Sequence, residues 1–365
     1  MRLIITGGHV TPALAVIEEL MSRKNVETFF VGRKHNSNID KSLTLEYKEI
    51  TSLKIPFFHL TTGRLTRLFS KQTFFEILKI PLGVYYAWRL INKIKPDKIL
   101  SFGGYIALPV AFCGFLKKIP VYTHEQTINP GIANRIIGLF ANKIFLSFPE
   151  SNKNWNKSKV IISGNPIRKQ IFQHHVLNWV PHKNQKVLFI TGGSLGAHSI
   201  NQHISRIINQ LTAKYTIIHQ TGDTQEYDDF TLLSNLRFEL PKGQQENYII
   251  KKHISGDEIG SIYCFSDLVI GRAGANTISE LIALKKPAIL IPLPWSAGQE
   301  QLKHAEYLNK NKVAEIFEQS KTSKELLNLI EKTISALQNY QKSYLQFISH
   351  NQNNAAQTLA NSLFD

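Results

Sequence analysis

The chain has 365 residues, more than the ~250–300 at which one hydrophobic core usually divides into two. Hydrophobic residues make up 43% of it and charged residues 19%, a composition that excludes an intrinsically disordered protein. The formal net charge of +16 indicates an anionic partner: a nucleic acid, a phosphorylated substrate or an anionic membrane.

The cysteines and the most apolar segment indicate the cellular compartment in which the protein is expected. Cys113 and Cys264 lie far apart, in apolar surroundings and without metal-ligand spacing, so we expect two buried thiols in a reducing compartment. YIALPVAFCGFL (105–116) is shorter than the ~18 residues that span a bilayer. Met1 leads directly into an expected strand, so no signal peptide is predicted. We expect a cytoplasmic protein that is not integral to a membrane.

The first predicted elements are a strand, a turn and a helix. RLII (2–5) predicts the strand, and Gly7–Gly8 predicts the turn. Thr11 suits an N-cap and Pro12 suits the first helical turn, so we expect the helix to begin there. The expected buried face of this helix carries Leu14, Ile17, Leu20 and Met21. ETFFVG (27–32) predicts the second strand.

The same pattern returns in the second half of the chain. A strand is predicted from Lys186, followed by a turn at Gly192–Gly193 and one helix. Thr191 begins the second TGG sequence, 185 positions after Thr6 begins the first. The repeat predicts two doubly wound α/β domains. The expected buried face of the second helix carries Ile200, Ile204, Ile207, Ile208 and Leu211.

Short apolar stretches alternate with helical patterns in both halves and predict the other strands of two parallel sheets. They are KILSFGGY (98–105), IPVYTHE (119–125), KIFLSF (143–148), TIIHQTG (216–222), DLVIGRAG (267–274) and PAILIPLP (287–294). We place a first domain at residues 1–163 and a second at 164–345, with a linker around ISGNPIRKQIF (162–172). A C-terminal helix within 346–365 is expected to pack back on the first domain.

Glycine-bearing loops follow strands in both predicted domains, where open α/β sheets bind their ligands. They are Gly7–Gly8, Gly103–Gly104, Gly192–Gly193 and Gly271 to Gly274. One such loop would be an ordinary tight turn, but four favour a ligand site that includes a phosphate. In GRAGANTISELIA (271–283), Glu280 is placed either to accept hydrogen bonds from a ribose diol or only to interact with the helix dipole.

These stretches resemble the MurG family of bacterial peptidoglycan synthesis. The matching segments are TGGHVTPALAV, SFGGYIALPVAF, IPVYTHEQ, GNPIR, TGGSLGAHSIN and GRAGANTISELIALKKPAILIPLP, which run from Thr6 to about Ala305. The resemblance implies a GT-B fold, in which two Rossmann-like α/β domains face a cleft. It also implies transfer of N-acetylglucosamine from UDP-N-acetylglucosamine to the undecaprenyl-linked lipid I, which forms lipid II. The first domain would take the acceptor and the second the donor.

The resemblance also implies the site residues. The resemblance places Thr6, Gly7, Gly8 and His9 on the acceptor side of the cleft. Thr6, Gly7 and Gly8 are also expected to contact the donor. Gly103, Gly104 and Tyr105 would bind the acceptor. The other donor-binding residues would be Thr127, Arg168, Gly193, Ser194, Ile254, Ala275, Asn276, Thr277, Ile278, Ser279, Glu280 and Gln301. The sequence has no Asp-x-Asp motif, so neither a metal nor a cofactor is expected.

Inverting transfer needs a base that deprotonates the acceptor hydroxyl. His9 and Glu125 are the candidates, and His9 is preferred because an unperturbed histidine titrates near ~6.5. Two alternatives stay open: His9 as a helix cap or phosphate donor, and Glu125 as a structural partner of His124. The chain departs from the family pattern in its shortened first glycine loop, and in Thr127 and His304, which stand where the family has asparagine.

Other functions also remain possible at this stage. They are a UDP-N-acetylglucosamine 2-epimerase-like isomerase, a glycosyltransferase with another lipid acceptor, and a basic membrane- or nucleic-acid-binding protein. No nucleic-acid-binding module is recognised, so no nucleic acid is expected.

Basic and aromatic residues are interleaved between residues 64 and 98, which predicts peripheral docking on the anionic inner membrane surface, at the cytoplasmic face. In the alternative interpretation, Tyr85, Trp88 and Ile91 pack on the sheet, and the cations form an ordinary solvated face. The residues are Arg64, Arg67, Lys71, Lys79, Arg89, Lys93, Lys95 and Lys98, with Phe69, Phe74, Phe75, Tyr85, Tyr86 and Trp88.

Overall fold

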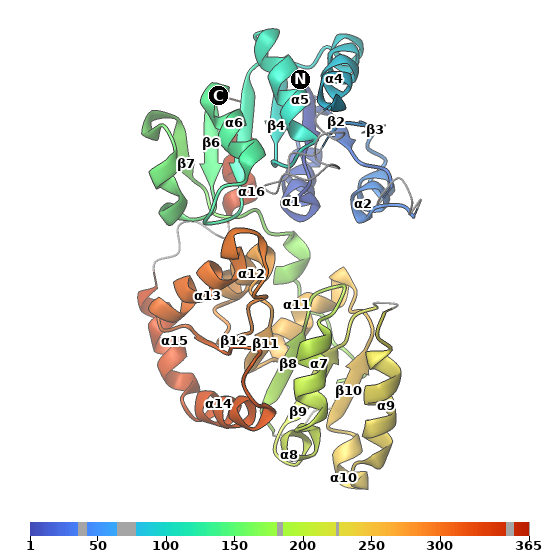
Figure 1. Ribbon diagram of the computed structural model, residues 1–365, viewed down its shortest axis with the longest axis vertical. Coiled ribbons are helices and arrows are strands. Elements are labelled where there is room, and N and C mark those ends of the chain that lie inside the picture. The colour runs from blue at the N-terminus through green and yellow to red at the C-terminus, as the bar shows by residue number, and fades with distance from the viewer. Residues whose placement is uncertain (36–41, 64–77, 181–184, 224–225, 348–353, 365) are drawn as a thin grey trace. The chain divides into compact units, whose positions relative to one another are not determined.

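The computed structural model describes residues 1–365 except 36–41, 64–77, 181–184, 224–225, 348–353 and 365. The chain divides into two compact units, residues 1–168 with 350–365 and residues 169–349 (Figure 1). The division predicted from the sequence lies between Ser163 and Gly164. Each unit is described by itself.

The first unit contains a seven-stranded parallel sheet in the order β3-β2-β1-β4-β5-β6-β7. Its central strands are nearly continuous apolar runs, as expected for strands buried on both faces. The register pairs Ile4 with Phe29 on one side and with Ile99 on the other. The strands are β1 (Arg2–Thr6), β2 (Glu27–Gly32), β3 (Phe57–His59), β4 (Lys98–Ser101), β5 (Val121–Glu125), β6 (Lys143–Leu146) and β7 (Val160–Ile162).

Helices cover both faces of this sheet, because alternate side chains of a strand point to opposite faces. Leu3 and Ile5 pack with one group of helices, which includes α1 and α16, while Ile4 packs with α4, α5 and α6. The helices are α1 (Val10–Met21), α2 (Leu45–Ser52), α4 (Ile80–Ile94), α5 (Ala107–Leu116), α6 (Ile132–Phe140) and α16 (Ala355–Ser362), with short 3-10 helices η1 (Pro149–Asn154) and η2 (Lys157–Lys159).

The helices α1 and α16 differ in how well they match the predictions from the sequence. The N-cap of α1 is His9 and not Thr11, and Met21 is 58% exposed, outside the buried face. The C-terminal helix α16 packs on α1. Lys98 Nζ donates to the carbonyl of Leu363 at 2.7 Å, which ties the C-terminal segment to β4.

The second unit contains a six-stranded parallel sheet in the order β10-β9-β8-β11-β12-β13. Its strands are β8 (Val187–Thr191), β9 (Thr216–Gln220), β10 (Tyr248–Lys251), β11 (Leu268–Gly271), β12 (Ala288–Leu290) and β13 (Ala314–Ile316). Its helices are α7 (His198–Ser205), α8 (Ile208–Thr212), α9 (Asp229–Glu239), α10 (Lys242–Gln245), α11 (Gly256–Phe265), α12 (Ala275–Leu284), α13 (Glu300–Lys310), α14 (Ser323–Ser335) and α15 (Leu337–Gln346), with 3-10 helices η3 (Lys169–Phe172) and η4 (Ala297–Gln299).

The helix predicted after Gly192–Gly193 is divided into α7 and α8. Ile207, between them, has φ −123° and ψ 6°, outside the helical region, so one continuous helix was wrong. The five residues of its predicted buried face are nevertheless all buried in the core. Of the two cysteines, Cys113 is buried as expected and Cys264 is exposed, contrary to expectation. Among the described residues, no helix has the length and hydropathy needed to cross a membrane.

Candidate active site

In the first unit, the loops after β1 and β4 meet at the carboxyl edge of the sheet. The Gly8 amide donates to the carbonyl of Gly103 at 3.1 Å. Gly7 has φ +149°, and a Cβ there would lie 2.8 Å from the Cβ of Phe102. Gly104 has φ +82°, and a Cβ there would lie 3.1 Å from the Gly8 nitrogen. The glycines are therefore required by this close approach of two loops. Tyr105 follows them, and its hydroxyl lies 3.4 Å from Arg33 Nη1, which donates to it.

Glu125, at the end of β5, holds the next loop with a fully hydrogen-bonded carboxylate. Its Oε1 accepts from the amide and the hydroxyl of Thr127 at 2.9 and 2.8 Å. Its Oε2 accepts from the Gly131 amide at 3.1 Å and from Asn134 Nδ2 at 2.9 Å. The residue is 2% exposed. With four donors on two oxygens, the carboxylate shapes residues 126–131 and has little capacity left to accept a substrate proton.

The environment of His124 excludes the suggested pairing with Glu125. Nε2 of His124 lies 3.2 Å from both the Gly164 carbonyl and the Ser147 hydroxyl. Burial lowers the pKa of His124 to about 3. The ring is therefore neutral at physiological pH, and the structural partners of Glu125 are Thr127, Gly131 and Asn134. The side chain of Thr127, a predicted donor contact, is engaged in this loop.

His9 lies at the start of α1 and is exposed. His9 occupies the N-cap position, but its side chain makes no capping hydrogen bond, so a capping role for the imidazole was wrong. Its Nδ1 lies 2.7 Å from Nε2 of Gln126, the residue after Glu125. Desolvation lowers the pKa of His9 from its usual value, and the Glu125 carboxylate acts in the opposite direction. Thr6 is fully buried at the end of β1.

Arg168 lies at the end of the first unit, beside α2. Its Nη1 is 3.6 Å from Glu49 Oε2, and both side chains are partly exposed. Such a pair contributes little to stability because water screens it. The guanidinium can therefore exchange Glu49 for another anion at small cost.

In the second unit, the loop after β8 presents Gly193 and Ser194 to solvent. Gly193 has φ +86°. Its amide donates to Thr191 Oγ1 at 3.0 Å, and its carbonyl accepts from Gln220 Nε2 at 2.8 Å. A Cβ at Gly196 would lie 2.0 Å from the carbonyl oxygen of Thr221, so this loop is packed tightly against the loop after β9.

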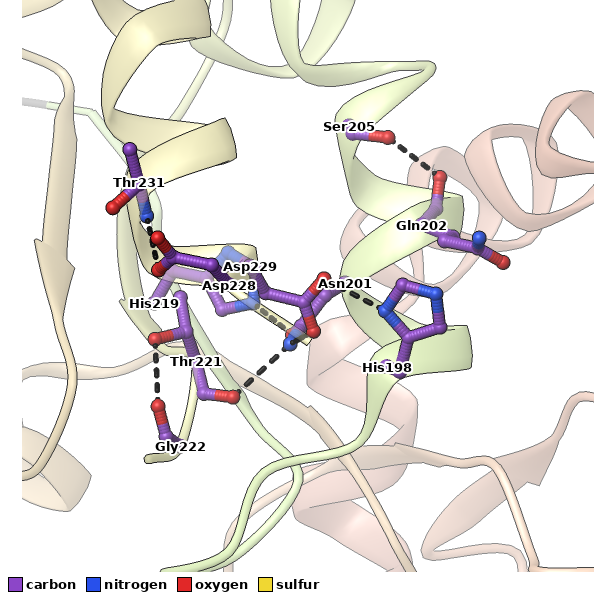
Figure 2. A network of polar contacts seen from close by, with 10 residues as sticks. All are labelled: His198, Asn201, Gln202, Ser205, His219, Thr221, Gly222, Asp228, Asp229 and Thr231. Atoms are coloured by element: carbon purple, nitrogen blue, oxygen red, sulfur yellow. Dashed lines mark hydrogen bonds and ion pairs between the residues drawn. The ribbon is translucent and has the colours of Figure 1, made fainter. Parts of the chain in front are cut away.

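A buried polar network, which the sequence analysis missed, supports these two loops (Figure 2). Asn201 Nδ2 donates to the Thr221 carbonyl at 3.0 Å and to Asp229 Oδ2 at 2.7 Å. The other oxygen of Asp229 lies 2.7 Å from His198 Nδ1. His219 Nε2 lies 3.0 Å from Asn201 Oδ1, and burial lowers the pKa of His219 to about 3. The signal in the sequence is a histidine and a glutamine within the apolar strand TIIHQTG.

The helix α12 carries most of the predicted uridine and ribose contacts. The side chains of Ile278 and Ser279 are fully buried, so they cannot reach a ligand at the surface. Ala275 is also buried, while Asn276 and Thr277 are partly exposed. Ile254, after β10, is 4% exposed, which leaves little of its side chain for the uracil.

Glu280 lies beyond the first turn of α12, where the helix dipole has largely decayed, so the dipole alternative is disfavoured. Its Oε2 accepts a hydrogen bond from the hydroxyl of Tyr263, on α11, at 2.9 Å. Tyr263 is buried, and burial with the adjacent carboxylate raises its pKa well above the usual range. The tyrosine therefore remains a donor that holds the carboxylate in place.

Gln301, in the first turn of α13, organises the loop after β12. Its side-chain Oε1 accepts a hydrogen bond from the backbone N–H of Leu293 at 3.0 Å. The backbone N–H of Gln301 donates to Ser296 Oγ at 3.3 Å. His304, one turn later, is fully buried, with Nδ1 3.1 Å from the Ala273 carbonyl. Burial lowers the pKa of His304 to about 4. His304 therefore supports the loop between β11 and α12 through the Ala273 carbonyl, and its side chain does not reach solvent.

The described residues contain no group of three or more His, Cys, Asp or Glu side chains placed to hold a metal ion.

Comparison with known proteins gives the family. Residues 4–146 match the glycosyltransferase family 28 N-terminal domain, and residues 187–362 match the C-terminal domain of that family. The UDP-N-acetylglucosamine–N-acetylmuramyl-(pentapeptide) pyrophosphoryl-undecaprenol N-acetylglucosamine transferase of Clostridium perfringens is 34% identical over 355 residues, which cover 94% of this chain and 92% of the relative. The chain belongs to the MurG family.

Solved structures agree with membership of the MurG family. The crystal structure of MurG from Acinetobacter baumannii has a TM-score of 0.74 and 25% identity, covering 99% of this chain and 98% of the other. UDP-GlcNAc 2-epimerase from Neisseria meningitidis has a TM-score of 0.68 and 14% identity, covering 100% of each chain, which shows a shared fold only. The expected GT-B fold class and the assignment as a glycosyltransferase are confirmed.

Proposed function

We propose that this chain transfers N-acetylglucosamine from UDP-N-acetylglucosamine to undecaprenyl-linked lipid I, which forms lipid II. The observation that carries the proposal is 34% identity over 94% of the chain to a transferase named for this reaction. The isomerase alternative has only a likeness of fold, at 14% identity.

The second unit provides the donor half of the reaction. Gly193 and Ser194, in the exposed loop after β8, would lie against the diphosphate, which Ser194 would bind through its backbone N–H and its hydroxyl. Glu280, held by Tyr263, would accept hydrogen bonds from the ribose diol, and Gln301 would contact the sugar. The leaving diphosphate needs this stabilisation most as its charge develops, because preorganised donors act mainly on the transition state. Arg168, at the end of the first unit, would supply a cation for the diphosphate in exchange for its pair with Glu49.

The first unit provides the acceptor half. His9 is the base in this proposal, because the carboxylate of Glu125 already accepts four hydrogen bonds. The lowered pKa keeps the imidazole of His9 neutral at pH 7, ready to accept a proton. The acceptor would be bound by Gly103, Gly104 and Tyr105. The Gly8–Gly103 hydrogen bond holds their loop beside the loop that carries His9.

The first unit would also dock on an anionic membrane through α4 and α5. On α4, Tyr85, Tyr86 and Trp88 are 54%, 44% and 39% exposed. Tyr85 and Trp88 therefore do not pack on the sheet as the alternative interpretation expected. Ile91 is buried, as that interpretation expected. Lys117 Nζ lies 4.0 Å from the centroid of the Trp88 ring. Further exposed apolar residues nearby in the chain are Leu78, Leu82, Phe112, Phe115 and Leu116. Of the residues proposed for docking, Arg64, Arg67, Phe69, Lys71, Phe74 and Phe75 lie outside the described residues.

The function is tested by incubating the purified chain with radiolabelled UDP-N-acetylglucosamine and lipid I, then separating lipid products from nucleotide sugars. Transfer of label to the lipid, dependent on lipid I, is expected. Reactions without acceptor control for isomerisation: a 2-epimer of the nucleotide sugar, formed without lipid I, would support the isomerase instead. A second lipid acceptor with a different head group tests acceptor choice.

A further inference from the structure

The Gln126 side chain joins two loops that are far apart in the sequence. Gln126 is 8% exposed and lies after β5, while His9 lies after β1, with β4 between these strands in the sheet. Its Nε2 is 2.7 Å from His9 Nδ1. Its other polar atom, Oε1, is buried and has no hydrogen-bond partner among the described residues. A buried amide oxygen without a partner is costly, so the orientation of this amide needs an explanation.

The orientation of the amide decides which nitrogen of His9 carries the proton. If Gln126 Nε2 donates to Nδ1, neutral His9 must carry its hydrogen on Nε2, and that nitrogen cannot act as a base. If the amide is rotated by 180°, Oε1 accepts a hydrogen bond from Nδ1–H, and Nε2 keeps its lone pair. The rotated amide gives Oε1 the hydrogen bond that it lacks and places the NH2 group where Oε1 now lies.

We propose that Gln126 is a positioning residue that selects the Nδ1–H tautomer of His9 through its Oε1, and so leaves Nε2 free to take the proton of the acceptor hydroxyl. The inference rests on the proposed transferase function. In the reaction, the acceptor oxygen forms its bond to the anomeric carbon as the bond from that carbon to the diphosphate oxygen of UDP breaks. The hydroxyl proton passes to His9 Nε2, and Nδ1–H stays on Gln126. The imidazolium then returns the proton to solvent.

A neutral amide suits this position better than a carboxylate. Glu125, at the end of β5, is the charged group that raises the pKa of His9, and His124 on the same strand is neutral. A second carboxylate against Nδ1 would stabilise the imidazolium and move the working pH upward. Gln126 orients the ring without adding charge.

The direct test is the tautomer of His9 in the full chain, read from ¹⁵N chemical shifts of histidine-labelled protein near pH 8, with the His9→Ala variant to assign the signal. The wild type is expected to show Nδ1–H with Nε2 unprotonated. In Gln126→Leu, the ring should move towards the Nε2–H tautomer, which is the usual one for a free histidine. A wild-type His9 that carries its proton on Nε2 would overturn the inference.

Kinetics distinguish positioning from a structural role. Gln126→Leu should lower kcat by about 10²-fold, within the range of general base catalysis, with the KM for UDP-N-acetylglucosamine unchanged. In the His9→Ala background, the same substitution should have no further effect; an additional loss of similar size would contradict the proposal. Gln126→Glu, which can only accept from Nδ1–H, should retain activity and move the acidic limb of the kcat/KM profile upward by about one pH unit. An unshifted acidic limb would also contradict it.

The proposed function and the positioning role of Gln126 can fail separately. If the wild-type chain does not transfer the sugar, the proposed function is wrong, but the ¹⁵N measurement still decides whether Gln126 sets the tautomer. If transfer occurs and Gln126→Leu retains full turnover, the function stands and the positioning role is overturned.

Discussion

The hydroxyl of Tyr263 donates a hydrogen bond to Glu280 Oε2 at 2.9 Å, and so links α11 to α12 in the second unit. Tyr263 is 2% exposed, with its ring packed edge-on against Phe189. A rigid, buried donor therefore fixes the orientation of a partly exposed carboxylate. This is the arrangement expected where a carboxylate must meet a ligand in one geometry.

Replacement of Glu280 by alanine should weaken UDP binding by about 10- to 100-fold. Hydrogen bonds to a charged group contribute about 1.5–3 kcal/mol, and the ribose diol would lose its acceptor. Calorimetric titration with UDP measures the change, with circular dichroism to show that the fold is retained. Glu318→Ala, at an exposed position of the same unit, is the control. UDP affinity equal to that of wild type would exclude Glu280 from the ribose site.

Tyr263→Phe should weaken UDP binding by about 3- to 10-fold, since it removes a hydrogen bond of about 1 kcal/mol without removing the carboxylate. In the Glu280→Ala background it should have no further effect on affinity. Tyr344→Phe is a matched control, because that buried hydroxyl donates to the Lys286 carbonyl at 2.8 Å, in the same unit. A similar loss in both tyrosine variants would indicate general destabilisation and not positioning.

His9→Ala should lower turnover by about 10²–10⁴-fold if His9 is the general base. UDP affinity should be unchanged, because the contacts proposed for UDP, apart from Arg168, lie in the second unit. Because the pKa of His9 is lowered, the acidic limb of the wild-type profile should lie below pH 6.5. His174→Ala, at an exposed histidine, is the control. Only a few-fold loss of turnover, with the pH profile preserved, would assign His9 to phosphate binding.

Reversal of charge on α4 should weaken membrane docking. Arg89 and Lys93 are exposed on this helix, and each basic residue near an anionic surface contributes about 1 kcal/mol. Arg89→Glu with Lys93→Glu should lower the partition into anionic vesicles by at least about tenfold at low salt, and wild-type binding should fall as salt rises. Lys310→Glu with Lys332→Glu makes the same change of net charge in the second unit. Wild-type protein that does not co-sediment with anionic vesicles at low salt would exclude docking.

The buried histidines should make stability fall in acid. Burial lowers the pKa of His124 and His219 to about 3 and that of His304 to about 4, from 6.5. Below pH 6.5 the unfolded chain binds protons that the folded chain excludes, so each histidine should lower the free energy of unfolding by about 1.4 kcal/mol per pH unit, down to its folded pKa. Above pH 6.5 the contribution is fully present.

His304→Asn isolates one of these three contributions. The asparagine amide can still donate to the Ala273 carbonyl, but it does not titrate. Urea unfolding at pH 7.5 and pH 5.5 should show a smaller loss of stability on acidification in the variant than in wild type, whatever its stability at pH 7.5. Equal losses would mean that His304 does not remain neutral in the folded chain.

The sequence by itself determined that each unit begins with a strand, a glycine loop and a helix. It also determined the family. Period-two and period-3.6 patterns are local properties, so the strands from RLII to PAILIPLP and the buried face of α7 and α8 could be predicted from spacing alone. The four edge strands β3, β7, β10 and β13 went unpredicted, because three or four residues are too few to give such a periodic signal.

Only the tertiary structure decided what the polar residues of the loops do. Glu125 and His9 were both candidate bases from the sequence, with His9 preferred for its usual pKa. The fold surrounds Glu125 with four donors and leaves His9 exposed beside Gln126. The partners lie on different strands, and parallel sheets bring together loops that the sequence separates by 117 residues. No local pattern specifies such contacts, because they depend on the strand order β1-β4-β5 and on which side chains lose their water when the sheet is covered on both faces.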